Sequence, residues 1–242
     1  MICEQSLSKF IATFGTYSRR AAEKLIRAGN VTVFGKTVIS PEIKVSGQAF
    51  VCVDGRPLTA PVEKIYAILN KPEGFLTTTS DDKGRATVMN LIPKKFHNKI
   101  YPVGRLDCAS RGLLLLTNDG DLAYRLSHPK FMIQKTYFVT LDRNATTLDL
   151  ENIRKGFFLH DGFIKADSVK FAFSGGRRRI LISLHSGRNR IVRRIFLQLG
   201  YHVQILERVE YAGLNIKNLA SGQIRLLSSK EVAGLINKSV QT

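Results

Sequence analysis

One carboxylate in the chain stands among cations, directly before an apolar run. In the stretch GRLDCASRGLLLLTNDGD, residues 104 to 121, Asp107 follows Arg105 and precedes Arg111, and four leucines come next. A continuous aliphatic run of this kind predicts a buried strand, so Asp107 is expected at the mouth of that strand. The residues leave two interpretations open. Asp107 is structural, as a counter-charge or a helix cap, or it is a reactive group.

An arginine-rich segment offers this acid a partner. From Arg177 to Arg194 the chain contains seven arginines and no acid, a composition that suits phosphate contacts and salt-dependent binding. On a helix that begins at Ile191, steps of about 100° place Arg193 between apolar side chains and Arg194 on the polar side. A half-buried guanidinium needs an anionic partner, and Asp107 is one of the few acids with no obvious one. The candidates for phosphate contacts in this segment are Arg188, Arg190 and Arg194.

The sequence gives little support for a reactive cysteine, a metal site or a cofactor-binding loop. The three cysteines are widely spaced, with no C-x-x-C pair and no histidines at ligand spacing, so free thiols are predicted at Cys3, Cys52 and Cys108. Cys108 adjoins Asp107 and could be read as a nucleophile, but no histidine lies near it and we interpret it as inert. The chain has neither a G-x-x-x-x-G-K-[ST] nor a G-x-G-x-x-G loop. We therefore expect an enzyme of this sequence to use no cofactor and no metal.

The overall charge indicates the class of partner. Lysine and arginine number 37 against 19 aspartates and glutamates, a formal charge of +18. An excess of this size favours nucleic acid as the partner, with an anionic membrane surface as the alternative. The leucine run is far shorter than the roughly 20 residues of a spanning helix, and the beginning MICEQSLSKF does not have the pattern of a secretory signal. We expect a cytoplasmic monomer without membrane association.

Residues 1–60 are expected to form a small basic domain. Apolar residues at Leu7, Phe10, Ile11 and Phe14 follow helical spacing, and Ser18 is suited to cap a second helix that ends at Gly29. Short strands should follow. The second helix carries four cations on one face, and together these patterns resemble the S4 RNA-binding domain. The alternative is an ordinary solvated face, but we predict RNA contacts at Arg19, Arg20, Lys24 and Arg27.

A proline-containing linker around residues 57–64 precedes a second domain, residues 61–242. Strands are predicted at 112–117, 135–141, 163–173 and 179–185, and helices at 120–126, 147–155 and 191–199. Strands and helices without a regular βαβ rhythm indicate an α+β domain on a mixed, mostly antiparallel sheet.

Four ordered stretches of this domain resemble the RsuA/RluB-type ribosomal RNA pseudouridine synthases, and the order of an S4 domain before a catalytic domain matches as well. The stretches run through most of residues 64–214 and read NKPEGFLTTTSDDKGRATVMNLIP, YPVGRLDCASRGLLLLTNDGDLAYRLSHP, QKTYFVTL and HSGRNRIVRRIFLQLGYHVQILERVEYAGL.

The resemblance implies a reaction and roles for residues. It implies Asp107 as the catalytic aspartate, Tyr137 as the aromatic residue beside the target base, and Arg193 as the arginine paired with the aspartate. The last assignment agrees with the helix-face argument. Isomerising uridine to pseudouridine breaks N1–C1′ and rejoins the base through C5, so no cofactor is needed, and a carboxylate nucleophile can divide the reaction into easier steps. The base must first leave its stack, and Arg105 is placed to fill the gap or hold a phosphate.

The expected substrate is ribosomal RNA, with the large subunit slightly favoured. Two alternatives stay open. A non-catalytic ribosome-associated RNA-binding protein would explain the charge but not the set of Asp107, Tyr137 and Arg193. A methyltransferase behind an S4 domain would require a cofactor loop that the sequence does not show.

Overall fold

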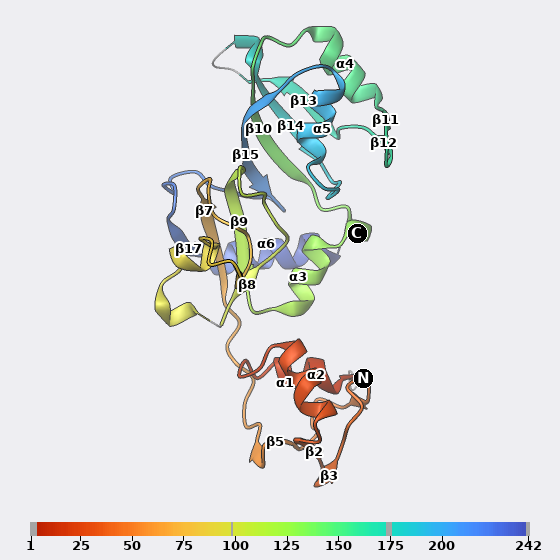
Figure 1. Cartoon of the computed structure of the whole chain (residues 1–242), viewed down its shortest axis with the longest axis vertical. Helices are drawn as coiled ribbons and strands as arrows, with labels where there is room; N and C mark the ends of the chain where they lie inside the picture. Colours follow the sequence, from red (N-terminus) through yellow and green to blue (C-terminus); the bar gives the residue numbers. More distant parts are fainter. Residues whose placement is uncertain (1–3, 98, 173–175, 241–242) are drawn as a thin grey trace. The chain divides into compact units, whose positions relative to one another are not determined.

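The computed structural model describes residues 4–97, 99–172 and 176–240. The chain divides into two compact units, Met1–Lys64 and Ile65–Thr242 (Figure 1). The predicted division at residue 60 lies shortly before this boundary. Cys3 lies outside the described residues, and Cys52 and Cys108 are free thiols.

The first unit is built from two helices and short strands. Helix α1 (Leu7–Ala12) and helix α2 (Arg19–Arg27) pack through Leu7, Ile11 and Ile26. The Ser18 hydroxyl accepts the Ala21 N–H at 3.2 Å, as the sequence predicts for an N-cap. The strands pair as β1–β4 and in the order β3-β2-β5-β6; they are β1 (Gln5–Ser6), β2 (Val31–Val33), β3 (Lys36–Thr37), β4 (Lys44–Val45), β5 (Val51–Val53) and β6 (Arg56–Pro57).

The second unit is organised around one sheet, in which nine strands belong to the described residues. The main path runs β13-β14-β10-β15-β9-β7-β17, and only the β15–β9 pairing is parallel among the described pairs. The predicted mixed, mostly antiparallel sheet is confirmed. Its strands are β7 (Tyr66–Lys71), β8 (Tyr101–Pro102), β9 (Arg111–Thr117), β10 (Lys135–Leu141), β13 (Ser168–Phe171), β14 (Arg179–Leu184), β15 (Val203–Tyr211), β16 (Leu214–Asn215) and β17 (Ile224–Leu226).

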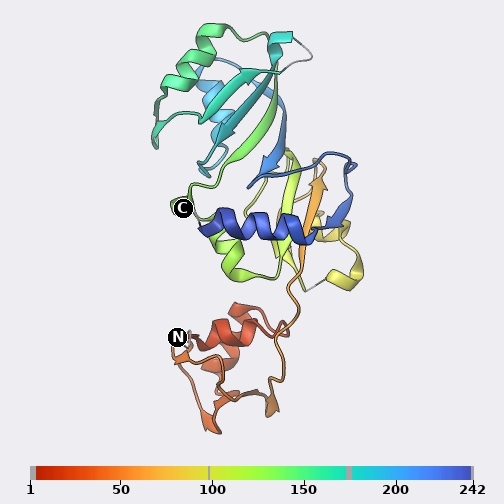
Figure 2. The same ribbon diagram turned by 180° about the vertical axis from the view of Figure 1, so that it is seen from behind.

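Helices cover the two ends of this sheet separately. Helices α4 (Thr147–Lys155) and α5 (Ile191–Gln198) pack on β10, β13 and β14, whereas α3 (Gly120–Ser127) and α6 (Ser229–Val240) pack on the part formed by β7 and β9 (Figure 2). A third cluster, which includes Leu106 and Leu114, fills the opposite face of β7 and β9. Short 3-10 turns are η1 (Val88–Leu91), η2 (Lys94–Phe96), η3 (Pro129–Phe131) and η4 (Gly176–Arg178).

One predicted strand is wrong. The stretch 163–173 forms two strands, because β12 (Gly162–Ile164) pairs with β11 (Phe157–Leu159), while β13 pairs with β14. Between them the Ala166 N–H bonds to the Ile153 carbonyl at 3.2 Å, and the buried Ala166 side chain lies in the core. The chain therefore turns out of one sheet and into the other. Phe173 lies outside the described residues.

Gly112 fixes the start of β9. Its φ is +104°, and a Cβ there would collide with the carbonyl of Arg208 on β15. Only glycine lets the two parallel strands come this close. The close contact fixes the point at which the segment containing Asp107 enters the sheet.

Candidate active site

Asp107 lies in the loop of residues 104–110, between β8 and β9. The preceding Leu106 is buried in the core beneath the sheet, whereas Arg105 and Cys108 are exposed. The Ser110 N–H bonds to the Asp107 carbonyl at 3.0 Å and closes a turn. Asp107 is half-buried at the rim of the core, which is the position predicted for it at the mouth of the leucine strand.

The backbone of this loop is held by side chains from three distant segments. The Lys71 ammonium, at the end of β7, donates to the carbonyls of Asp107 at 3.2 Å, Cys108 at 3.4 Å and Ser110 at 2.7 Å. Arg193 donates to the Ala109 carbonyl at 2.8 Å, and the Thr77 hydroxyl to that of Leu106 at 2.7 Å. Five consecutive loop carbonyls thus accept hydrogen bonds from side chains, which rigidifies the turn around Asp107.

Lys71 is the central cation of this arrangement. The residue is 0% exposed, and burial lowers its pKa, while the charges of Cys108, Glu73 and Asp107 act in the opposite direction. A buried ammonium is stable only when its donors are satisfied, and here carbonyl oxygens satisfy them. The sequence analysis did not assign Lys71. Its signal was a lysine at the end of a predicted strand, in NKPEG, where the buried strand would otherwise continue apolar.

Arg193 occupies the half-buried position that the helix-face argument predicts. Its guanidinium donates to the carbonyls of Val203 and Ala109, each at 2.8 Å. Burial and the nearby Arg190 lower its pKa, and the charges of Asp107 and Glu73 raise it. The described residues contain no Arg193–Asp107 ion pair within 4.0 Å. In the structure Arg193 therefore binds the backbone beside Asp107 and not the carboxylate itself, and the pairing of the two side chains stays a prediction.

Tyr137 lies on β10, half-buried, and packs against the core around β14 and against the cluster that contains Leu106. The β10–β15 register shifts between Thr136 and Tyr137. Such a bulge re-aims a side chain and is frequent beside active sites. The structure thus brings Tyr137 to the core that supports the Asp107 loop, and its catalytic role stays a prediction.

Unsatisfied polar atoms are concentrated at this place. In the part of the chain that the structure describes, the buried side-chain nitrogen and oxygen atoms without a partner belong to Ser110, Arg111, Arg193 and Arg208. Ser110 and Arg111 adjoin Asp107, and Arg208 pairs with Gly112. Buried polar atoms without a protein partner are rare, and water, a bound ligand or local strain accounts for those that remain. The neighbourhood of Asp107 thus offers polar atoms that water or a ligand can bind.

Two arginines that the sequence predicts as phosphate contacts bind groups of the protein itself in the structure. Arg194 donates through both terminal nitrogens to the carboxylate of Asp161, at 2.8 and 2.5 Å. Arg188 donates to the carbonyls of Gly162 at 3.1 Å and Phe163 at 2.8 Å. Both arginines therefore bind the β11–β12 hairpin at or beside its turn, where Asp161 lies. Arg190, by contrast, is exposed at the beginning of α5.

The four cations predicted on the first unit are all exposed on α2, and Arg19 pairs with Glu23 at 3.4 Å. They belong to the first unit, whereas Asp107 belongs to the second. The assigned cations are Arg19, Arg20, Lys24 and Arg27.

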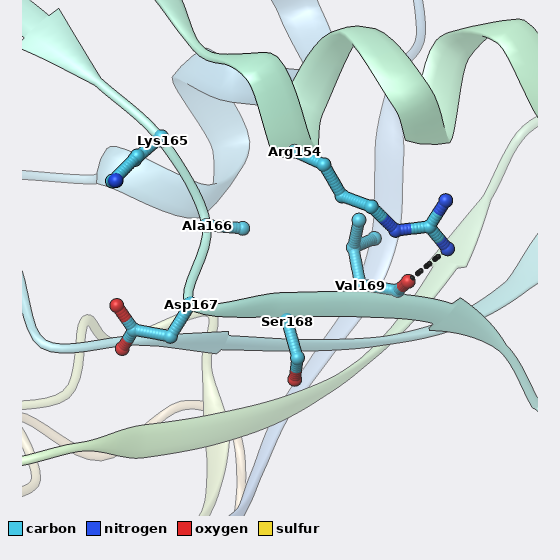
Figure 3. Close-up of a pocket in the computed structure, with 6 residues that line it drawn as sticks. All are labelled: Arg154, Lys165, Ala166, Asp167, Ser168 and Val169. Atoms are coloured by element: carbon cyan, nitrogen blue, oxygen red, sulfur yellow. Dashed lines mark hydrogen bonds between the residues drawn. The ribbon is translucent and has the colours of Figure 1, made fainter.

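A surface hollow elsewhere contains none of the predicted site residues. It is lined by Arg154, Lys165 and Asp167, among others, and the Arg154 guanidinium donates to the carbonyl of Val169, another lining residue, at 2.7 Å (Figure 3). Within the described residues no group of histidine, cysteine and acidic side chains could hold a metal ion. No helix of the described ranges is long and apolar enough to cross a bilayer.

The loop of residues 104–110 holds the Asp107 carboxylate on a rigid turn. The two cations that hold this turn, Lys71 and Arg193, bind its carbonyl oxygens. The Asp107 side chain has no hydrogen bond or ion pair to any residue that the structure describes. A positioned and unengaged carboxylate in a positive field can act as a nucleophile or accept a proton.

The chain is similar to known proteins along most of its length. Residues 65–198 match the family model described as RNA pseudouridylate synthase. A ribosomal large subunit pseudouridine synthase B of Bacillus subtilis is 39% identical over 234 residues, covering 96% of this chain and 95% of the relative. A protein of the same name from Vibrio cholerae is 37% identical over 234 residues, covering 94% of this chain and 73% of the relative.

A solved structure supports the same assignment. The crystal structure of a pseudouridylate synthase superposes with a TM-score of 0.69 at 28% identity, covering 96% of this chain and 99% of that one. The family match includes the Asp107 loop, Tyr137 and Arg193 and extends over more than half of the sequence. The chain therefore belongs to the RNA pseudouridylate synthase family.

Proposed function

We propose that this chain isomerises a uridine of large-subunit ribosomal RNA to pseudouridine, with Asp107 as the nucleophile. The observation that carries the proposal is the engagement of Lys71 and Arg193 with the loop carbonyls, which leaves the Asp107 carboxylate unengaged. The large subunit is proposed because relatives aligned along nearly the whole chain carry that name. Bacteria are the source of these relatives, and they assemble ribosomes in the cytoplasm, where we expect this reaction to occur.

The reaction needs a group that takes over bonding while the base turns. The N1–C1′ bond breaks, the uracil rotates, the C5–C1′ bond forms, and the hydrogen from C5 is lost to solvent while N1 gains a proton. Asp107 supplies the electron pair, either at C1′ or by deprotonating C2′. Lys71 and Arg193 hold the turn so that the carboxylate meets the sugar without reorganisation. Tyr137 stacks on the uracil beside it.

The chemistry predicts a direct assay. Purified protein should release tritium from [5-³H]uridine in large-subunit ribosomal RNA with no additive, since the isomerisation gains and loses no heavy atom. Small-subunit ribosomal RNA is the matched control and should release little. Turnover that requires a methyl donor, or tight RNA binding without release of label, would instead favour a methyltransferase or a binding protein.

We further propose that the first unit adds affinity through an S4-like RNA-binding face on α2. Its exposed cations support the proposal, because each phosphate that a cation neutralises steepens the dependence of log K on log salt by about 0.7–0.9 units. The full-length triple variant Arg20→Gln, Lys24→Gln, Arg27→Gln should flatten the salt slope by about two units and leave the rate at saturating RNA unchanged. An unchanged slope would mean a solvated face.

A further inference from the structure

The hairpin β11–β12 stands apart from the main sheet. Its strands Phe157–Leu159 and Gly162–Ile164 pair only with each other among the described strands. A lone two-stranded hairpin is marginally stable in water, so this one depends on its anchors.

Those anchors come from α5 and the turn before it. Arg188 binds two backbone carbonyls of β12, and Arg194 grips the Asp161 carboxylate at the turn with both terminal nitrogens. Arg193, the next residue on the same helix, donates to the Ala109 carbonyl in the Asp107 loop. Adjacent arginines thus bind the hairpin turn and the proposed catalytic loop, so the hairpin is held at the side of the active site.

The outward face of the hairpin is aromatic. Phe157 and Leu159 pack on the core and Ile164 is buried, so the alternation along the strands sends Phe158 and Phe163 outward. These two are cross-strand partners with ring centroids 5.4 Å apart. They are 75% and 45% exposed, and Phe158 is the most exposed large hydrophobic side chain in the described ranges. The outward face of a surface hairpin is ordinarily polar.

The charges around the aromatic pair are positive. Lys155 and Lys165 are exposed at the open end of the hairpin, just before Phe157 and just after its cross-strand partner Ile164, and Arg190 is exposed close to Arg188. The acid of the turn, Asp161, is neutralised by Arg194. An exposed ring amid cations suits a ligand that has a flat face and a negative backbone. Aromatic side chains in a positive groove are the usual means of holding single-stranded nucleic acid.

We propose that Phe158, supported by Phe163, stacks on an unpaired base of the RNA substrate close to the target uridine. This inference rests on the proposed function and names a substrate contact for it. A base that leaves its helix exposes neighbours that lose their stacking partner, and an anchored ring beside the active site can replace that partner. The interaction is with an unpaired nucleotide and does not involve duplex RNA.

Binding by the full-length protein tests the proposal. Single-stranded ten-nucleotide oligouridine and a ten-base-pair RNA duplex serve as probes, with Phe158→Ala and Phe158→Tyr as variants. Loss of one base stack should weaken oligouridine binding by roughly 5- to 150-fold in Phe158→Ala, while Phe158→Tyr binds like the parent and duplex binding is unchanged. Leu148→Ala removes a side chain that is 61% exposed on α4 of the same domain, and as the matched control should change neither.

A photochemical measurement guards against an indirect effect. Oligouridine with one 5-iodouridine, irradiated on the parent protein, should crosslink to the peptide that contains Phe158. Phe158→Ala that binds oligouridine like the parent, or that only lowers the melting temperature, would show a cross-strand packing role and overturn the proposal. So would a crosslink elsewhere, or equal weakening on the duplex. If Phe158→Ala left the RNA affinity unchanged but abolished binding of another protein chain, the surface would be assigned to a protein partner and the proposal would be overturned.

The two proposals fail separately. If the parent isomerises no ribosomal uridine but loses oligouridine affinity in Phe158→Ala, the proposed function fails and the stacking contact stands. If Phe158→Ala binds and turns over like the parent, the contact fails and the proposed function stands.

Discussion

Two loops of the second unit each present an aspartate to an arginine of α5, and the two are held in opposite ways. At the β11–β12 turn, Arg194 binds the Asp161 carboxylate itself with two nitrogens. In the Asp107 loop, the neighbouring Arg193 binds a backbone carbonyl, and buried Lys71 binds three more.

The difference separates a structural acid from a reactive one. An aspartate whose oxygens accept a bidentate guanidinium is strongly stabilised in its charged form, which makes its carboxylate a weaker nucleophile and base. An aspartate whose loop is held through the backbone receives the positive field, and its oxygens stay available. Both arginines lie in one run, IVRRIF, so their different roles arise from one step along a helix.

The largest effect on stability is expected from Lys71→Met. The change removes the donor to three loop carbonyls, of which that of Ser110 is buried, and a buried group left unsatisfied costs about 1–3 kcal/mol. The melting temperature should fall by at least roughly 2 °C, since 1 kcal/mol shifts a domain of this size by about 2–4 °C. Lys94→Met, at an exposed position of η2, is the control and should melt like the parent. A Lys71→Met protein as stable and active as the parent would contradict the role given to this cation.

Arg193→Ala and Arg194→Ala should separate chemistry from anchoring. Arg193→Ala frees the Ala109 carbonyl and should slow the single-turnover rate on the order of a hundred-fold, since small displacements of a catalytic group have effects of that size. Arg194→Ala should lower the melting temperature, keep the rate at saturating RNA, and leave the salt slope of binding unchanged. A slope reduced by about one unit would restore Arg194 as a phosphate contact.

The smallest expected effect concerns the stability of the protein at low pH. The hydrogen bond from Arg194, aided by the charges of Arg194 and Arg188, holds the pKa of the Asp161 carboxyl well below its usual 3.8. A carboxylate with a depressed folded-state pKa contributes stability that is present above its unfolded pKa and is lost as pH falls below that value. The parent should therefore lose stability more steeply than Asp161→Asn below about pH 4. Parallel urea-midpoint curves for the two proteins between about pH 5 and 2 would refute this role.

Much of the fold follows from local sequence. The predicted bounds of β10 and α4 coincide with those observed, and Ser18 caps α2 as expected. The error at 163–173 arose because two β-forming runs are joined by a short segment whose backbone bonds to α4 and β14. The segment between Phe163 and Phe171 contains no glycine or proline. The sequence therefore gives no local signal that the chain changes from pairing with β11 to pairing with β14.

The site could be predicted in its residue types and less so in its contacts. Helical geometry correctly placed Arg193 on a half-buried face. Its hydrogen-bond acceptors are backbone carbonyls, and because every residue has a carbonyl, the sequence does not show which ones Arg193 binds. The role of Lys71 depends on a loop 36 residues away, a separation that no local pattern encodes. Arg194 was assigned to phosphate from its place on the polar side of the helix, and its partner Asp161 lies 33 residues earlier, beyond the reach of a local pattern.

The central claim is that Asp107 performs the chemistry and Asp161 does not, and one paired measurement tests it directly. Single-turnover pseudouridine formation on large-subunit ribosomal RNA should be measured for Asp107→Asn and Asp161→Asn, with melting temperatures recorded on the same samples. We expect Asp107→Asn to melt near the parent and lose roughly four orders of magnitude or more in rate, as when a nucleophile is removed. Asp161→Asn should melt lower and keep the rate of the parent. A folded Asp107→Asn protein that isomerises uridine as fast as the parent would contradict the account.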